Sequence, residues 1–421
     1  MAVPVGESPT LWLDLSTQNR PGESSLPPDG REPVVRMVDL IVFDAIGKRA
    51  SDIHLETYDG EFRIRYRIDG VLYPVASPPL ALRDALISRV KILGDLDIGE
   101  RRLPQDGRIR MKAPQAGEDQ EIDLRVSSLP TIFGEKLVLR ILDRERLPRK
   151  LSDLGMEEAS LGRMRRALRK SHGIVLATGP TGSGKTSTLY TCLSRLNEPG
   201  LNINTVEDPV EFNLSGINQV QTKDSVGLGF ATALRALLRQ DPDILMVGEI
   251  RDRETAVIAI RAAITGHLVL STLHTNDAAS TPGRLLDMGI PPFLIANSVN
   301  LVCAQRLVRK LCGECKEPDR SPAPIPEPAR TGPDPILEVS RFEARGCPAC
   351  HGTGYRGRIG LFEAMEVTET IQQLILRRAD ATRIRKQAVS EGMITLRDSG
   401  LEKVRAGVST LEEVLKATHL A

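Results

Sequence analysis

Glycine, lysine and hydroxyl side chains follow one another closely near the middle of the chain, in the pattern G-x-x-x-x-G-K-[ST]. Such glycines allow backbone N–H groups to surround a polyphosphate, the lysine reaches the β- and γ-phosphates, and the hydroxyl ligates Mg²⁺. An apolar run at 174–177 and a helix-compatible segment at 186–196 flank the pattern, which predicts a phosphate loop between strand and helix. The alternative is a turn that only connects them. The residues are Gly179, Pro180, Thr181, Gly182, Ser183, Gly184, Lys185 (phosphates), Thr186 (metal) and Ser187.

Acidic side chains end two further strand-like runs. Glu207 closes the run 202–207, and Glu249 follows the run 244–247. Because the carboxyl ends of parallel strands meet at one edge of a sheet, both carboxylates are expected near the phosphate loop. We assign Glu249 to Mg²⁺ and Glu207 to orientation of the attacking water. His274, after the strand-like run 268–271, is expected to sense the γ-phosphate. For either acid alone, a helix N-cap or a solvated strand end is the alternative.

Four cysteines form two C-x-x-C pairs, with residues 316–346 between them. Four thiolates with this spacing close a tetrahedral Zn²⁺ site that leaves no position open for chemistry. A disulfide or redox role is the alternative. Cys192 and Cys303 lie in apolar surroundings and are expected to be inert core residues. The predicted zinc ligands are Cys312, Cys315, Cys347 and Cys350.

Composition limits the classes of protein that this chain can represent. Its 421 residues carry 56 basic and 55 acidic side chains, a net charge of +1 that gives no general attraction to nucleic acid or acidic lipid. Aromatic residues make up only 3%, too few for base-stacking surfaces. No apolar run reaches about 18 residues and no signal peptide is apparent, so the expected compartment is the cytosol.

Periodicity predicts an α/β protein of several domains. Alternating strand patterns such as 62–68 favour a small mixed domain, and the later succession of helix and strand patterns favours a parallel sheet covered by helices on both faces. The predicted order is a disordered leader (1–34), a small N-terminal α/β domain (35–143), a linker (144–155), a phosphate-loop domain (156–305), a tetracysteine module (306–360) and a C-terminal helical region (361–421).

Taken together, these motifs resemble those of the secretion ATPases, the motors of type II secretion and type IV pilus assembly. Residues 179–186 match the family's Walker A motif, 202–211 its Asp box, 234–249 its Walker B region with Glu at the commoner Asp position, and 266–276 its His box. The resemblance covers about residues 36–421. It implies a RecA-like P-loop motor domain after a PAS-like domain, and ATP, Mg²⁺ and, in assembly-type members, Zn²⁺ as cofactors.

The same resemblance gives roles to arginines and partners. Arg125 and Arg140 lie at the positions of the family's arginine fingers, and Arg235 and Arg239 match positions at the nucleotide or the subunit interface. Arg251 and Arg284 match further such positions, with surface charge as the alternative. The implied assembly is a homohexamer that extrudes pilin-like subunits, in the cytoplasm and peripheral to the inner membrane through platform proteins, without nucleic acid.

The leader is shorter than the N-terminal domains with which larger family members dock on a platform protein. We therefore expect membrane recruitment by such a domain to be in question here. Three other functions stay open at this point. They are a nucleic-acid translocase with the same motor core, a nucleotide-binding scaffold that does not hydrolyse, and a phosphotransfer kinase.

Overall fold

The computed structural model describes residues 33–115, 118–142, 148, 150–319 and 341–418. It divides into two compact units, Met1–Glu145 with Gly346–Gly354, and Arg146–Arg345 with Tyr355–Ala421. The predicted leader lies almost wholly outside the described residues, as does the first part of the predicted linker. Among the described helices, none combines the length and the hydropathy needed to cross a bilayer.

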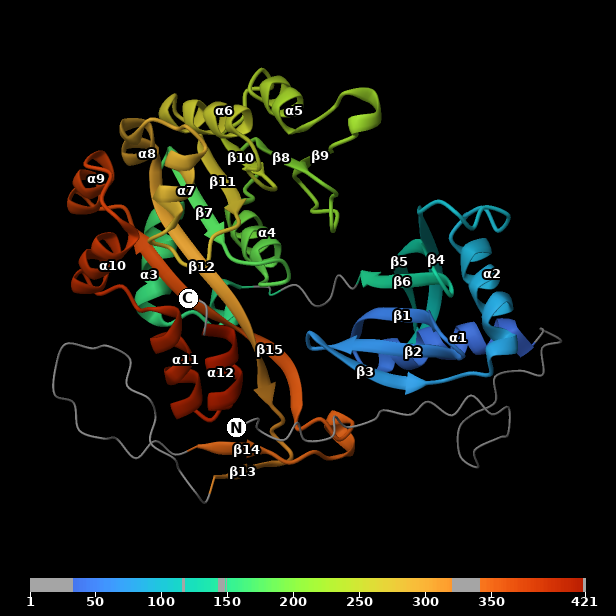
Figure 1. The fold of residues 1–421 in the computed structure, drawn as a ribbon. Coiled ribbons are helices and arrows are strands. Elements are labelled where there is room, and N and C mark those ends of the chain that lie inside the picture. The colour runs from blue at the N-terminus through green and yellow to red at the C-terminus, as the bar shows by residue number, and fades with distance from the viewer. Residues whose placement is uncertain (1–32, 116–117, 143–147, 149, 320–340, 419–421) are drawn as a thin grey trace. The chain divides into compact units, whose positions relative to one another are not determined.

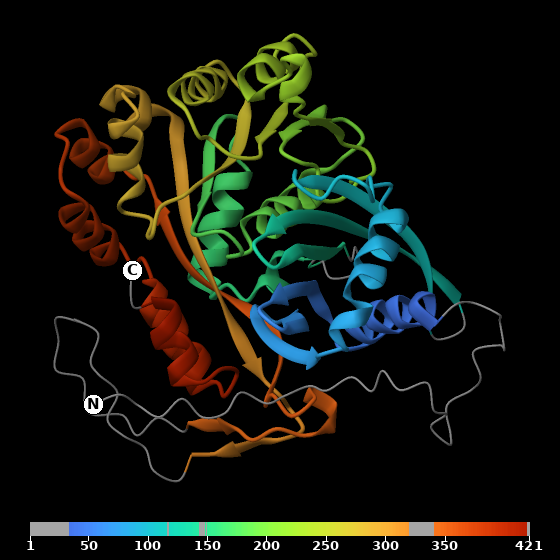
Figure 2. The ribbon, with the colours of Figure 1, turned by 45° about the vertical axis from the view of Figure 1, so that its right-hand side comes forward.

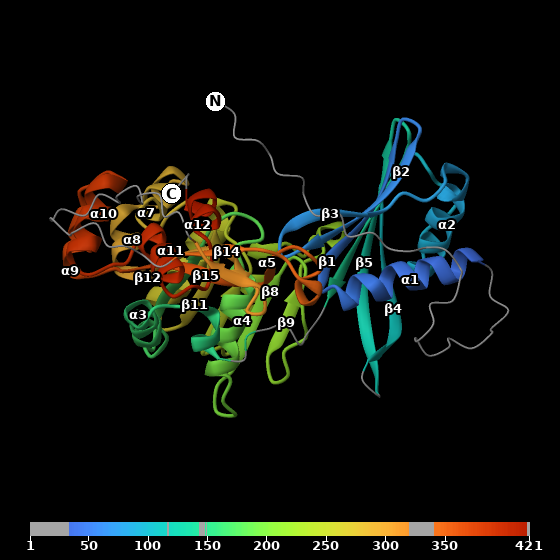
Figure 3. The same cartoon turned by 90° about the horizontal axis from the view of Figure 1, so that it is seen from below.

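The first unit is an antiparallel sheet with two helices against one face (Figure 1; Figure 3 shows α1 and α2 on the same side of the strands). Apolar residues of β2, such as Phe62 and Ile64, alternate with arginines and pack with Val38 and Ile41 of α1. The alternation leaves the opposite face polar. The sheet order is β3-β2-β1-β6-β5-β4. The elements are α1 (Pro33–Gly47), β1 (Ala50–Tyr58), β2 (Glu61–Ile68), β3 (Val71–Ala76), α2 (Arg83–Leu93), β4 (Gln105–Gln115), β5 (Glu118–Thr131) and β6 (Gly134–Leu142).

The second unit is built on a largely parallel sheet with helices on both faces (Figure 2). The sheet order is β15-β12-β7-β11-β10-β8-β9, and only β15 runs antiparallel to its neighbour. One apolar cluster joins this sheet to α5, α6 and α8, and another joins it to α3 and α4. The predicted α/β fold with a parallel sheet is confirmed.

The sheet strands of this unit are β7 (Gly173–Thr178), β8 (Ile203–Glu207), β9 (Asn218–Gln221), β10 (Ile244–Val247), β11 (Leu268–Leu273), β12 (Val299–Leu311) and β15 (Tyr355–Glu366). A separate antiparallel pair consists of β13 (Lys316–Pro318) and β14 (Phe342–Ala344). The helices are α3 (Glu158–Leu168), α4 (Lys185–Leu196), α5 (Phe230–Leu237), α6 (Arg253–Ile264), α7 (Thr281–Asp287), α8 (Pro292–Ser298), α9 (Glu369–Leu376), α10 (Ala381–Ser390), α11 (Leu396–Arg405) and α12 (Leu411–Thr418).

Two long strands depart from the sequence prediction. The boundaries expected at 305/306 and 360/361 fall inside β12 and β15. The expectation of helix from residue 361 is wrong for 361–366, which continue β15, and α9 begins only at Glu369. The apolar run of β15 around Leu361 and Phe362 is buried on both sides, and periodicity alone cannot distinguish such a strand from a buried helix.

Candidate nucleotide site and cysteine cluster

The phosphate-loop pattern lies where the sequence predicted it, between the buried strand β7 and the start of α4. Three of its glycines, Gly179, Gly182 and Gly184, have positive φ angles of 146°, 78° and 89°. Side chains disfavour this backbone region, so the loop needs glycine at these places. The hydroxyl oxygen of Ser183 is buried without a hydrogen-bond partner among the described residues. A phosphate oxygen in the loop is a natural partner for it, so the residues present fit a bound polyphosphate.

Lys185 is folded back onto the loop that carries it. Its ammonium donates to the carbonyl oxygens of Gly179 at 2.8 Å and Pro180 at 3.0 Å. Burial lowers the pKa of Lys185 to about 8; the Glu249 carboxylate opposes this shift and the Arg306 guanidinium adds to it. The site therefore holds a poorly solvated cation, which is the electrostatic condition that favours a phosphate.

Glu249 and His274 come together at the tips of neighbouring strands. Glu249 follows β10 and His274 follows β11, and His274 Nε2 lies 3.6 Å from Glu249 Oε2. Arg251 also pairs with Glu249, and its Nη1 lies 3.7 Å from Asp208 Oδ2. The structure thus brings the predicted metal carboxylate and the predicted γ-phosphate sensor to one edge of the sheet.

Glu207 is more completely engaged than the sequence suggested. The residue is 3% exposed, and its carboxylate accepts hydrogen bonds from Thr205 Oγ1 at 2.6 Å, from Gln219 Nε2 at 3.0 Å and from the Tyr190 hydroxyl. Burial raises the pKa of Tyr190, and the hydrogen bond to the Glu207 carboxylate raises it further. Glu207 therefore joins α4 and β9 to the end of β8. Tyr190 and Gln219 were missed because no local pattern marks residues that meet only through the fold.

The predicted basic residues of the motor domain lie at exposed positions in or just after helices. Arg235 at the end of α5 pairs with Glu254 of α6, and Arg239 donates to the Arg235 carbonyl oxygen at 3.0 Å. Arg284 on α7 is exposed. Their roles at a nucleotide or subunit interface stay predictions.

Arg125 and Arg140 stand directly opposite each other on β5 and β6 of the first unit. The register extends this pair into a row across the sheet, with Arg108 beside Arg125, Asp52 beside Arg140, and Arg67 beyond Asp52. Arg140 Nε donates to Asp52 Oδ1 at 3.1 Å. Arg108 also pairs with Asp123, and Arg67 Nε lies 3.6 Å from Asp52 Oδ2, so the row holds four guanidinium groups beside two carboxylates. Like charges directly opposite each other destabilise a sheet, so an anion would stabilise the excess positive charge of this surface.

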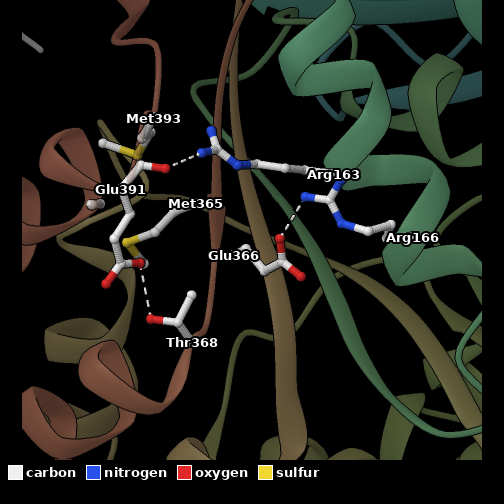
Figure 4. A pocket seen from close by; sticks show the side chains of 8 residues that line it. Arg163, Arg166, Met365, Glu366, Thr368, Glu391 and Met393 are labelled. Carbon is white, nitrogen blue, oxygen red and sulfur yellow. Dashed lines mark hydrogen bonds and ion pairs between the residues drawn. The ribbon is translucent and has the colours of Figure 1, made fainter.

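Hydrogen bonds and an ion pair link the residues that line a small pocket in the second unit (Figure 4). Arg163 of α3 donates to the carbonyl oxygens of Glu391 at 2.7 Å and Gly392 at 3.0 Å, at the end of α10. Arg166, one turn along, pairs with Glu366 of β15 at 2.8 Å. These contacts brace α3 against β15 and α10.

The four cysteines of the two C-x-x-C pairs are clustered. The sulfur atoms of Cys312, Cys315, Cys347 and Cys350 all lie within 4.8 Å of one another. The Cys347 and Cys350 sulfurs are 3.7 Å apart, close to the roughly 3.8 Å edge of a tetrahedron with Zn–S bonds of about 2.3 Å. Backbone N–H groups of Cys347 and Gly354 point at the Cys350 sulfur at 3.1 and 3.2 Å, which favours a thiolate there. The donor set fits zinc.

The other two cysteines are fully buried, and burial raises the pKa values of the Cys192 and Cys303 thiols. Such thiols stay protonated and react slowly, in agreement with the expectation of inert core residues.

Comparison with known proteins identifies the family. The family model described as "Type II/IV secretion system protein" matches residues 28–416. The chain belongs to this family. The Myxococcus xanthus type IV pilus assembly ATPase PilB is 53% identical over 390 residues, which cover 92% of this chain and 68% of that protein. The Pseudomonas aeruginosa type II secretion system protein E is 49% identical over 387 residues, covering 92% and 76%.

Solved structures agree with this membership of the secretion-system family. The pilus retraction motor PilT with bound ADP matches with a TM-score of 0.56 and 25% identity, covering 90% of this chain and 95% of that one. The Legionella pneumophila ATPase DotB matches with a TM-score of 0.67 at 22% identity, covering 94% and 98%, and this likeness shows the fold.

Two residues of β12 were not singled out from the sequence, although the family match includes them. Gln305 and Arg306 are 2% and 7% exposed and lie against the phosphate loop. A signal was available, because the pair interrupts the apolar run 301–308, and a polar pair buried in such a run needs partners.

Proposed function

We propose that this protein is the Mg²⁺-dependent ATPase motor of a type II secretion or type IV pilus assembly machine. The observation that carries the proposal is a complete phosphate loop at the carboxyl end of β7, with Glu249 and His274 at neighbouring strand tips. Relatives at about half identity over nine tenths of the chain are named as components of these machines, several of them as ATPases. These names support an ATPase and not a kinase or a non-hydrolysing scaffold.

The residues of the site divide the work as follows. The loop 179–187 binds the phosphates, with Lys185 released from its two carbonyl partners to contact the β- and γ-phosphates. Thr186 and Glu249 would hold Mg²⁺, and the ion would neutralise charge on the phosphates. Glu207 orients the attacking water, for which one of its oxygens exchanges a protein donor for water. His274 senses the γ-phosphate.

The active site is completed by a neighbouring subunit in a homohexamer. The row that contains Arg125 and Arg140 supports this arrangement, because its four guanidinium groups outnumber the Asp52 and Asp123 carboxylates beside them, and a triphosphate would add negative charge. In this proposal the first unit is the PAS-like domain, Arg235 and Arg239 lie at the nucleotide or subunit interface, and ATP turnover moves the two units relative to each other.

The motor works at the cytoplasmic side of the inner membrane, where platform proteins recruit it, and extrudes pilin-like subunits. Zinc bound by the four cysteines has a structural role, because a Cys₄ set leaves no position open for substrate. The nucleic-acid translocase gains no support, since the relatives that match are secretion and pilus proteins and net charge is +1.

The test is steady-state ATP hydrolysis by the purified full chain, with and without Mg²⁺. Lys185→Ala removes the phosphate contact and should abolish turnover, whereas Lys170→Ala removes an exposed lysine of the same unit and should leave turnover unchanged. Wild-type rates in Lys185→Ala, or stimulation of turnover by DNA, would contradict the proposal.

A further inference from the structure

A buried arginine on β12 links the phosphate loop to the segment that carries His274. The last parallel pair between β12 and β7 joins Ala304 to Thr178, so the next two residues of β12 run beside the phosphate loop. A Cβ atom at position 179 would lie 2.6 Å from the Gln305 carbonyl oxygen and 3.2 Å from Arg306 Nη1. Only glycine fits there, which places the Arg306 guanidinium directly against the first residue of the loop.

Gln305 holds the other end of the same loop. Its side-chain nitrogen lies 2.7 Å from the place of a Cβ atom at Gly184, and its Oε1 accepts from Thr188 Oγ1 at 2.7 Å. Two consecutive residues of β12 thus contact the loop at Gly179 and at Gly184. These two contacts hold the loop against the sheet.

Arg306 makes a second contact, away from the loop. Its Nη2 donates to the carbonyl oxygen of Asn276 at 2.8 Å, while Nη1 donates to the Gln305 carbonyl oxygen at 3.1 Å. Asn276 is two residues after His274. No ion pair of Arg306 occurs within the described residues, and its guanidinium donates to backbone oxygens of β12 and of the His274 segment. It thus joins that segment to β12, at the place where its Nη1 lies against Gly179.

The far end of the His274 segment is anchored independently. Glu363 of β15 accepts from the Ala278 backbone N–H at 2.8 Å, and Asp277 pairs with Arg385 of α10. Between β11 and this anchor, the Arg306–Asn276 hydrogen bond ties the segment to β12, directly beside the first residue of the phosphate loop. Loss of the guanidinium would free His274 to move relative to the γ-phosphate while the downstream anchor stays in place.

We propose that Arg306 is a positioning residue for hydrolysis, which sets the place of His274 relative to the phosphate loop. The inference rests on the proposed function. It predicts an effect specific to ATP, because ADP has no γ-phosphate for His274 to sense. A role in general phosphate attraction would weaken ADP and ATP equally.

The experiment is a double-mutant cycle on kcat with Arg306→Gln and His274→Ala, with the Kd of MgADP measured for each variant. Arg306→Gln should lower kcat about tenfold, the value expected for loss of a charged hydrogen-bond donor, and should change the ADP Kd by less than about twofold. In the His274→Ala background, Arg306→Gln should lower kcat by less than about twofold, because its effect passes through His274.

Two further variants separate positioning from folding and from charge. Arg306→Lys keeps the charge but replaces the planar guanidinium fork, whose two terminal nitrogens reach the Gln305 and Asn276 carbonyl oxygens separately, with one ammonium nitrogen on a shorter stem, and should show most of the loss in kcat. Arg309→Gln removes a second arginine of β12, which is half-buried and pairs with Glu413, and should leave kcat within about twofold. Full activity in Arg306→Lys would overturn the positioning role.

The positioning role would also be overturned if the losses in kcat of the two single variants multiplied in the double mutant. It would be overturned too if Arg306→Gln raised the Kd of MgADP by as large a factor as it lowered kcat. These failures differ from failure of the proposed function. Wild-type protein without MgATP turnover contradicts the proposed function, whereas multiplicative losses in a protein that hydrolyses ATP contradict only the role of Arg306.

Discussion

Removal of the Lys185 charge should stabilise the nucleotide-free protein while destroying its activity. Lys185 is 9% exposed as a residue, and burial holds its pKa at about 8 against an ordinary 10.5. That difference corresponds to about 3 kcal/mol against the charged form in the fold. Lys185→Met keeps the length of the side chain without the charge. The carbonyl oxygens of Gly179 and Pro180 then lose their hydrogen-bond donor, which lowers the stability of the variant by about 1 kcal/mol. The free energy of unfolding at pH 7 should therefore rise by about 2 kcal/mol in all.

The assay is scanning calorimetry of the full chain without nucleotide. A gain of about 2 kcal/mol should raise Tm by roughly 4–8 °C. The matched control is Lys170→Met, which removes an exposed lysine and should change stability by less than about 0.5 kcal/mol. MgADP at 100 times its Kd should stabilise the wild type by about 2.7 kcal/mol and the variant far less. Lys185→Met should therefore have the higher Tm without nucleotide, and the wild type should have the higher Tm with MgADP.

The pH dependence has a definite sign. Between about pH 8 and 10.5 the unfolded chain binds the Lys185 proton while the folded chain has released it, so the free energy of unfolding of the wild type rises with pH. The advantage of Lys185→Met should therefore be complete below about pH 8 and shrink towards pH 10.5. A variant no more stable than the wild type at pH 7, or an advantage that grows with pH, would refute the reasoning.

The remaining predictions concern the zinc ligands and the two carboxylates. Purified protein should contain about one zinc per chain by elemental analysis, and Cys347→Ser should lower Tm before it lowers turnover; absence of metal with freely titrating native thiols would favour the redox alternative. Glu249→Gln should weaken the Mg²⁺ dependence of turnover, measured by metal titration. Glu207→Gln should spare nucleotide affinity and lower kcat, and loss of ATP affinity at an unchanged kcat would reverse that assignment.

The sequence predicted the centre of the site well, because each part of it has a local signal. An apolar run, glycines at positions that need positive φ, and a helix start specify β7, the phosphate loop and α4 without knowledge of the rest of the fold. The carboxyl ends of β10 and β11 were predictable for the same reason, since short apolar strands precede Glu249 and His274. Parallel strands then bring such tips together.

The parts that escaped prediction depend on register and long-range pairing. Arg306 reaches the loop only because β12 pairs with β7 and extends beyond it, and Tyr190 meets Glu207 only across the sheet. The edge strand β4 was missed since Ile109 and Met111 are almost alone among polar residues there, which gives a weak strand signal. None of these pairings leaves a pattern in a short window of sequence.

Mixing two inactive variants tests the central claim, an ATPase site shared between subunits, most directly. Arg140→Ala chains keep an intact phosphate loop, and Lys185→Ala chains keep an intact arginine. In randomly mixed rings at equal amounts, about a quarter of the sites combine one intact loop with one intact arginine from its neighbour. The expected ATP hydrolysis is therefore up to about a quarter of the wild-type rate.

The control mixture is Lys185→Ala with Glu249→Gln. Both changes lie in the second unit, where Glu249 acts on the pKa of Lys185, so mixing them should restore nothing. The predicted result is that the mixture of Arg140→Ala and Lys185→Ala hydrolyses ATP well above the sum of the two variants measured separately. Its specific activity should rise with protein concentration. No rescue in that mixture, with a specific activity independent of concentration, would contradict the shared site.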